Sequence, residues 1–70
     1  MNRVPVSSSS LLSVGYDSTT LTLEIGFHDG GVYQYYGVPS HIHQGLMSAS
    51  SKGRYFHQYI RDVYTFERII

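Results

Sequence analysis

The sequence predicts an α+β fold, in which a three-stranded antiparallel β-meander packs against two C-terminal helices. Residues 21–28 alternate between apolar and polar side chains, which is typical of a strand with one buried face. The Asp29-Gly30-Gly31 turn sequence follows, and a second run rich in tyrosine and valine comes directly after it. Apolar residues at helical spacing occur only after Pro39. We expect a single domain over residues 1–70, since the chain is short and contains no linker or internal repeat.

Residues 1–9 are expected to form an extended N-terminal segment at the edge of the sheet. Pro5 excludes a helix interior, and four consecutive serines, at 7–10, follow it. The meander is predicted over residues 10–37. Its first strand, residues 11–16, should place three apolar side chains on one face: Leu12, Val14 and Tyr16.

The second strand, residues 21–28, is the clearest in the sequence. One face should carry the apolar side chains of Leu21, Leu23, Ile25 and Phe27. The opposite face should carry the outward side chains of Thr22, Glu24 and His28. Residues 32–37 then return antiparallel to it.

The direction in which Tyr33 and Tyr35 point depends on the length of the hairpin loop. A three-residue loop, Asp29-Gly30-Gly31, would be a type I turn closed by a left-handed glycine. Phe27 would then lie opposite Tyr33 and Ile25 opposite Tyr35, so both tyrosines would join the core. We favour this loop because it gives both apolar residues a cross-strand aromatic contact.

A two-residue loop, either Asp29-Gly30 or Gly30-Gly31, would shift the pairing by one residue. Tyr33 and Tyr35 would then lie on the face of Glu24 and His28. Such exposed rings would form a platform on which single-stranded bases stack, at about 1 to 3 kcal/mol each.

Residues 40–64 are predicted to be the helical half of the domain. Ser40 is expected to cap a first helix over residues 41–49, which Gly45 weakens. A second helix is expected from Arg54 to about Val63, with an apolar stripe formed by Phe56, Tyr59, Ile60 and Val63. Residues 65–70 are expected to form an extended tail.

The composition argues against several classes of protein. The chain has no cysteine, so it has neither a disulfide framework nor a thiolate metal site, and we expect it in the cytoplasm. No apolar run approaches the roughly 20 residues of a membrane span, so no membrane partner is expected. His41 and His43 point to different sides of a helix, so neither a metal nor another cofactor is expected. Because no Ser-His-Asp order or carboxylate pair stands out, we do not expect an enzyme.

Charge is balanced overall, with five basic and five acidic residues, but it is unevenly distributed. No acidic residue lies between Gly31 and Arg61. Basic and aromatic side chains in this part of the chain could contact phosphates and bases: Tyr33, Tyr35, Tyr36, Lys52, Arg54, Tyr55, His57 and Arg61. The start of the second helix offers a candidate anion site at Ser50, Ser51 and Gly53. Helix capping alone also explains these last residues, and a solvated outer face also explains the basic stripe.

The order of several motifs resembles the KTSC domain, and the resemblance covers nearly the whole chain. Its centre is a Tyr-x-Tyr motif at Tyr33 and Tyr35, and its second signature is Ser51-x-Gly53-x-Tyr55-Phe56 leading into Ile60-Arg61. The chain departs from the family at His57, where asparagine is common. This bacterial and phage family is named for its occurrence at the carboxyl end of some lysyl-tRNA synthetases. The resemblance implies nucleic-acid binding, which has been proposed for the family.

Two functions are therefore expected. The first is a non-catalytic binding module for RNA, which uses tyrosines and a basic helix face. The alternative is a homo-oligomeric protein-interaction module that binds a small nucleotide-like ligand where its subunits meet.

Overall fold

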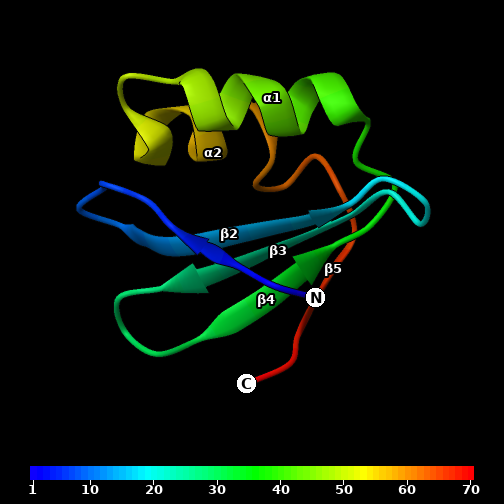
Figure 1. Ribbon diagram of the computed structural model, residues 1–70, viewed down its shortest axis with the longest axis horizontal. Coiled ribbons are helices and arrows are strands. Elements are labelled where there is room, and N and C mark those ends of the chain that lie inside the picture. Colours follow the sequence, from blue (N-terminus) through cyan, green and yellow to red (C-terminus); the bar gives the residue numbers. More distant parts are fainter.

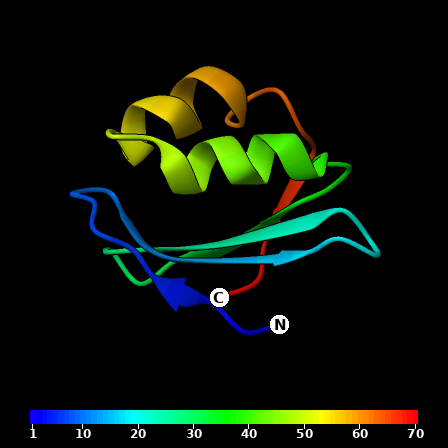
Figure 2. The ribbon, with the colours of Figure 1, turned by 45° about the horizontal axis from the view of Figure 1, so that its top comes forward.

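The computed structural model describes all 70 residues as a five-stranded antiparallel sheet whose strands follow chain order, β1-β2-β3-β4-β5. Two helices cover one face of this sheet, while both chain ends lie on the other side (Figures 1 and 2). The strands are β1 (Val4–Pro5), β2 (Leu11–Asp17), β3 (Thr22–Phe27), β4 (Val32–Tyr35) and β5 (Phe66–Arg68). The helices are α1 (Ser40–Ser48) and α2 (Lys52–Tyr59). The α+β class is confirmed.

The sheet has two more strands than the predicted meander, one at each edge. The N-terminal segment pairs with β2 as β1, with Val4 opposite Val14. The C-terminal tail pairs with β4 as β5, with Phe66 opposite Tyr35. Both segments were expected to be extended, and their pairing converts the three-stranded meander into a five-stranded sheet.

The prediction for the inward side chains of β2 was wrong at its start. Leu11 is fully buried, whereas Leu12 is 48% exposed. The register between β2 and β3 shifts between Leu11 and Ser13, so an extra residue interrupts the alternation at this point. Beyond the bulge, Val14 and Tyr16 face the helices as predicted, opposite Ile25 and Leu23.

In β3, Leu23 and Ile25 are fully buried under the helices, as predicted. Leu21 is not part of the strand and does not point inward. Its backbone has a φ of 57°, which places it in the turn before β3, and its side chain is 40% exposed. Glu24 points to the opposite face as expected, but it is buried rather than solvent-exposed.

The hairpin between β3 and β4 has a three-residue loop, but the loop starts one residue earlier than predicted, at His28-Asp29-Gly30. Phe27 and Gly31 close it, because the amide of Phe27 donates to the Gly31 carbonyl at 2.9 Å. Gly30 has the left-handed φ of 95°. The predicted cross-strand partners were therefore wrong by two residues: Ile25 lies opposite Tyr33, and Leu23 opposite Tyr35.

A shift of two residues preserves the face, because side chains alternate along a strand with a period of two. Tyr33 and Tyr35 consequently face the helices, as the three-residue loop predicted. Tyr35 is only 4% exposed and belongs to the core, while Tyr33 is half-buried beside it. Their rings lie 6.5 Å apart, centroid to centroid.

Both helices begin earlier than predicted. Ser40 is the first residue of α1 rather than its cap, because Pro39 occupies the cap position without a side-chain hydrogen bond. Helix α2 starts at Lys52 and ends at Tyr59, four residues before the predicted end. A tight turn follows, in which Asp62 has a φ of 62°. Of the predicted apolar stripe, Phe56 and Ile60 are buried, whereas Tyr59 and Val63 are exposed.

The core lies between the sheet and the helices. Nine buried side chains from every layer form it: Leu11, Val14, Leu23, Ile25, Tyr35, Val38, Leu46, Phe56 and Ile60. At its edge, the rings of Tyr16 and His43 stack with centroids 4.5 Å apart, and the Tyr16 hydroxyl donates to the Val38 carbonyl at 2.6 Å. Neither helix is long and apolar enough to cross a membrane.

The other face of the sheet carries a polar network below the helices. Arg3 forms an ion pair with Glu24 and donates from Nε to the Ser13 hydroxyl at 3.0 Å. Gln34 donates to the second oxygen of Glu24 at 2.8 Å. Glycines make room for the Arg3 side chain, since a β-carbon at Gly26 would lie 3.3 Å from its Nε atom. This coverage by Arg3 explains why Glu24 is buried.

Candidate nucleic-acid interface

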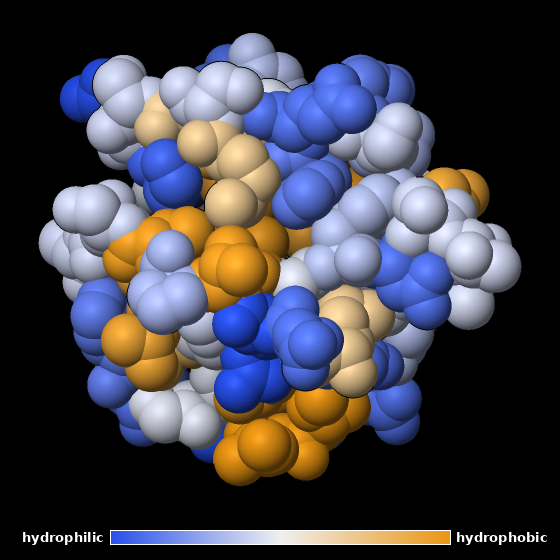
Figure 3. Space-filling model, in the orientation of Figure 1, coloured by the Kyte–Doolittle hydropathy of each residue, from blue (hydrophilic) through white to orange (hydrophobic).

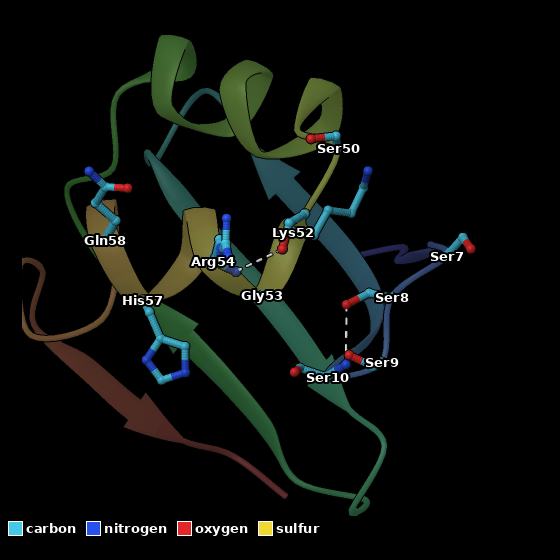
Figure 4. A pocket seen from close by; sticks show the side chains of 11 residues that line it. Ser7, Ser8, Ser9, Ser10, Ser50, Lys52, Gly53, Arg54, His57 and Gln58 are labelled. Atoms are coloured by element: carbon cyan, nitrogen blue, oxygen red, sulfur yellow. Dashed lines mark hydrogen bonds between the residues drawn. The ribbon is translucent and has the colours of Figure 1, made fainter.

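Two adjoining hollows lie beside α2. The first, which we call the serine groove, has a volume of about 630 Å³ and no apolar side chain in its lining. It lies between the loop that leads into β2 and the start of α2 (Figure 4). The loop contributes Ser7, Ser8, Ser9 and Ser10, and the helix region contributes Ser50, Ser51, Lys52, Gly53, Arg54, His57 and Gln58.

The N-terminus of α2 opens into the serine groove with unpaired amides. The Ser51 hydroxyl accepts from the Arg54 amide at 3.4 Å, which satisfies one amide of the first turn. The amides of Lys52 and Gly53 have no such partner. Amides at a helix N-terminus favour an anion, because the helix dipole places partial positive charge there.

Gly53 sets the distance between the two sides of the groove. A β-carbon at this position would lie 3.2 Å from the Ser10 hydroxyl oxygen, which is closer than most such contacts. Glycine therefore keeps the helix start and the serine loop close without filling the space between them. The loop itself is held by the Ser8 hydroxyl, which accepts from the amides of Ser10 at 3.2 Å and Leu11 at 3.1 Å.

The second hollow, which we call the aromatic pocket, has a volume of about 420 Å³. Five rings from the sheet and α2 line it: Phe27, Tyr33, Tyr35, Phe56 and Phe66. The Phe27 ring meets Tyr33 edge-on at 5.6 Å and Phe56 at 5.4 Å. Phe66 packs 5.7 Å from Tyr35 while remaining 54% exposed. A pocket of this size and lining is typical of a small-molecule site.

Polar side chains surround the mouth of the aromatic pocket. His57 and Arg61 lie on one side, and the Arg61 guanidinium is 3.2 Å from the Nδ1 atom of His57. Asp29 and Asp62 also line it. Burial, reinforced by Tyr33, raises the pKa of Tyr35 to about 12, so its hydroxyl stays protonated on the pocket floor.

The two hollows adjoin. Ser10, Gly53 and His57 line both of them, so the aromatic pocket lies directly beside the serine groove. No acidic residue lines the serine groove, whereas Lys52 and Arg54 do. The structure contains one ion pair, between Arg3 and Glu24 on the other face of the sheet, so no carboxylate neutralises these cations. Lys52 instead donates to the Ala49 carbonyl at 3.1 Å.

The structure brings most of the predicted site residues together. The serine groove contains Ser50, Ser51, Lys52, Gly53, Arg54 and His57, and the aromatic pocket contains Tyr33, Tyr35, His57 and Arg61. Tyr35 contributes only to the floor, because it is buried in the core. The exposed aromatic platform of the two-residue loop is therefore absent.

Two predicted residues lie elsewhere. Tyr36 is on the helix-free face of the sheet, where its hydroxyl contacts Gln34 at 3.1 Å and Glu67 at 3.0 Å. Tyr55 packs against Gly45 of α1 and against Tyr59, with ring centroids 4.7 Å apart in the tyrosine pair. Neither tyrosine lines the groove or the pocket.

The sequence did not single out several other lining residues. The run of four serines at 7–10 is conspicuous in the sequence, but no neighbouring residue indicates that it lies beside α2. Phe27 and Phe66 were assigned to the core and the tail, and the pocket forms only because β5 pairs beside β4. No group of three or more histidine, aspartate or glutamate residues is placed to hold a metal ion.

The architecture defines a small α+β domain with a polar hollow and an aromatic hollow side by side. The family model of the KTSC domain matches residues 7–64, so the chain belongs to the KTSC domain family. The crystal structure of a KTSC domain protein from Yersinia pestis superimposes with a TM-score of 0.96, at 49% identity, covering 99% of this chain and 97% of that one.

Sequence relatives are of two kinds. An uncharacterized protein of Stutzerimonas stutzeri is 47% identical over 58 residues, which are 83% of this chain and 82% of that protein. A lysine–tRNA ligase of Trichormus variabilis is 43% identical over 54 residues, and the match covers 77% of this chain but only 10% of the ligase. A lysine–tRNA ligase of Nostoc punctiforme matches in the same way, over 11% of its length at 36% identity.

Proposed function

We propose that this domain is a non-catalytic module that binds single-stranded RNA. The observation that carries the proposal is that the serine groove and the aromatic pocket adjoin, with Ser10, Gly53 and His57 lining both. A nucleotide has the same two parts, an anionic phosphate and a flat base joined by a sugar. The groove would hold the phosphate and the pocket would hold the base.

The groove suits a phosphate for three reasons. The free amides of Lys52 and Gly53 point out of the N-terminus of α2, Arg54 is exposed without a carboxylate partner, and serine hydroxyls line the opposite wall. Because the cations are few, the electrostatic contribution corresponds to one or two phosphates rather than to a long duplex.

The pocket suits a base because its rings are already in place. Phe66 and Tyr33 are accessible, while Tyr35 and Phe56 support them from the core. Stacking of a base on such rings contributes about 1 to 3 kcal/mol and tolerates different bases. Single-stranded RNA is the favoured partner because its bases are free to leave the strand and enter a pocket.

The test is fluorescence anisotropy with a labelled single-stranded RNA of mixed sequence, titrated at several salt concentrations. Lys52→Ala and Arg54→Ala should each weaken binding and reduce the slope of log K against log salt by about 0.7 if each side chain contacts one phosphate. Gln44→Ala is the control, since Gln44 is an exposed residue of α1 that lines neither hollow, and it should leave the slope unchanged. Salt-independent binding, or equal slopes in all variants, would rule out the proposal.

A second candidate is a homo-oligomeric interaction module, and the exposed edge strand β5 favours it. Phe66, Ile69 and Ile70 are 54%, 43% and 67% exposed along this edge. Figure 3 shows apolar surface gathered at the end of the molecule where Figure 1 places the C-terminus. A second copy at β5 would lie beside the aromatic pocket and could enclose a nucleotide-like ligand there.

Sedimentation equilibrium tests this second function. An oligomeric module should show mass increasing with concentration, and Ile69→Lys should abolish the increase by placing a charge on the edge. A monomer at every concentration, with RNA binding intact, would exclude the oligomeric function and leave the first.

A further inference from the structure

Arg61 and Asp62 present a donor and an acceptor side by side at the mouth of the aromatic pocket. Both line it, and they follow each other in the chain. They do not form an ion pair with each other or with any other residue, so the Asp62 carboxylate and the Arg61 N–H groups that do not face His57 are free to bind a ligand. His57 touches only the Arg61 side, through the 3.2 Å contact at Nδ1.

The backbone of this turn is held in place by several hydrogen bonds. The Arg61 amide donates to the Phe56 carbonyl at 2.8 Å, and the Val63 and Tyr64 amides donate to the Ile60 carbonyl at 3.1 and 3.3 Å. Asp62 lies between these bonds with its φ of 62°, a conformation that aspartate and asparagine tolerate better than most residues. The Arg61 and Asp62 side chains are thus carried by a fixed turn.

Both charges act on the floor of the pocket. Apart from burial and Tyr33, which raise the pKa of the Tyr35 hydroxyl, Arg61 lowers this pKa and Asp62 raises it. The positive charge of Arg61 and the negative charge of Asp62 therefore both lie near the buried Tyr35 ring, as expected from residues that line the same pocket.

The four RNA bases differ in how they match a carboxylate beside a guanidinium. Guanine offers two adjacent N–H donors, N1–H and N2–H, which fit the two oxygens of a carboxylate, and its O6 and N7 acceptors fit arginine. Adenine and cytosine each offer one amino group beside an acceptor nitrogen, which a carboxylate repels. Uracil offers one N–H between two carbonyl oxygens. Guanine alone offers two adjacent N–H donors to both oxygens of Asp62 while presenting an acceptor to Arg61.

We infer that the aromatic pocket selects guanine, with Asp62 accepting from N1–H and N2–H, Arg61 donating to O6, and the rings of Tyr33 and Phe66 stacking on the base. This inference rests on the proposed function and names the base that the pocket takes. Asp29, the other carboxylate of the lining, is already used by the hairpin, because its Oδ1 accepts from the Gly31 amide at 2.9 Å.

Isothermal titration with single nucleotides tests the inference, using GMP, AMP and IMP. GMP should bind about tenfold more tightly than AMP, since one bidentate pair discriminates between bases by about 5- to 150-fold. IMP keeps N1–H and O6 but lacks the 2-amino group, so its affinity should lie between those of GMP and AMP. Equal affinity for GMP and AMP would overturn guanine selectivity and leave RNA binding standing, whereas no binding of any nucleotide would overturn both.

Asp62→Asn is the decisive variant, because asparagine keeps the left-handed backbone and the shape of the side chain while removing the negative charge. It should lower the preference for GMP over AMP to about twofold or less, with AMP affinity preserved, because one partner of the bidentate pair is lost. Asp17→Asn is the matched control, since Asp17 is the last residue of β2 and lies outside both hollows. An Asp62→Asn protein that is folded by circular dichroism and still prefers GMP tenfold would refute the assignment of Asp62.

Discussion

The ring of Tyr55 on α2 lies against the backbone of Gly45 on α1. A β-carbon at position 45 would be 2.6 Å from the ring Cζ atom and 2.9 Å from Cε2, closer than atoms can approach. The ring also packs against Tyr59, with the ring centroids 4.7 Å apart. Glycine therefore lets the Tyr55 ring pack at the helix crossing, although it is among the poorest helix formers.

Gly45→Ala should destabilise the domain by about 2 kcal/mol, because overpacking outweighs the gain in helix propensity. In a Tyr55→Ala background the same substitution should instead stabilise it by up to about 1 kcal/mol, since only the propensity difference remains. Urea unfolding of the four proteins measures both values. The same sign in both backgrounds would show that Tyr55 does not impose the glycine.

His43 should make stability sensitive to mildly acidic pH. Burial lowers its pKa below 6.5, so the folded protein binds the proton less readily than the unfolded chain does. Its full contribution is therefore present above pH 6.5 and decreases as the pH falls through 6.5 toward the folded-state pKa. His43→Phe, which keeps a ring against Tyr16, should flatten this part of the stability profile. A slope as steep as that of the wild type would contradict the prediction.

Glu24 should produce a second, more acidic transition. Burial tends to raise its pKa, but the hydrogen bonds from Gln34 and Arg3 and the charge of Arg3 lower it overall, below 4.5. The carboxylate therefore stabilises the fold above pH 4.5, and this contribution is lost as the pH falls through the folded-state pKa. Glu24→Gln should remove the loss below pH 4.5 when urea midpoints are compared between pH 6 and 2. If the urea midpoint of Glu24→Gln fell below pH 4.5 as steeply as that of the wild type, the loss of stability would come from other carboxyl groups.

Arg3→Met should lower the free energy of unfolding by about 2 kcal/mol at neutral pH. This is somewhat less than the loss on breaking a fully buried ion pair, because Arg3 is partly exposed while Glu24 is buried. The variant leaves the Glu24 carboxylate without its counterion. Combining it with Glu24→Gln should recover most of the loss, since the buried charge is then absent as well. A double variant as unstable as Arg3→Met would show that packing of the arginine stem, rather than its charge, is what stabilises the sheet.

Gly53→Val should impair RNA binding without unfolding the domain. The valine would occupy the space between the helix start and Ser10, where even a β-carbon is only 3.2 Å from the hydroxyl oxygen. We expect a loss of affinity of about tenfold, equivalent to about 1.4 kcal/mol. Gln44→Val, an exposed substitution on α1, is the control in the same anisotropy assay. Wild-type affinity in Gly53→Val would place the ligand outside the serine groove.

Local patterns were sufficient for the parts of the fold that depend on neighbouring residues. Alternation defined β3, and the loop sequence placed Tyr33 and Tyr35 on the helix-facing side even though the loop starts one residue earlier. The bulge at Leu11–Ser13 left no such pattern, because inserting one residue into a strand requires no special side chain here. Leu21 was misplaced for a similar reason, since a leucine in a left-handed turn is unusual.

Long-range pairing accounts for what the sequence did not predict. Glu24 was assigned to solvent because Arg3, which covers it, is 21 residues away. The aromatic pocket needs Phe66 to reach Tyr35 across the β4–β5 pairing, and the serine groove needs the Ser7–Ser10 loop to meet α2. The basic residues of the site were nevertheless identified, because Lys52, Arg54, His57 and Arg61 are close in sequence and lie on or beside one short helix.

The outer strands of the sheet, β1 and β5, are also the first and last strands of the chain. Their free ends emerge on the side that the helices leave uncovered (Figures 1 and 2). A polypeptide fused to either end would extend away from α2 and from the serine groove. A fusion at either end would therefore leave the serine groove and the aromatic pocket uncovered.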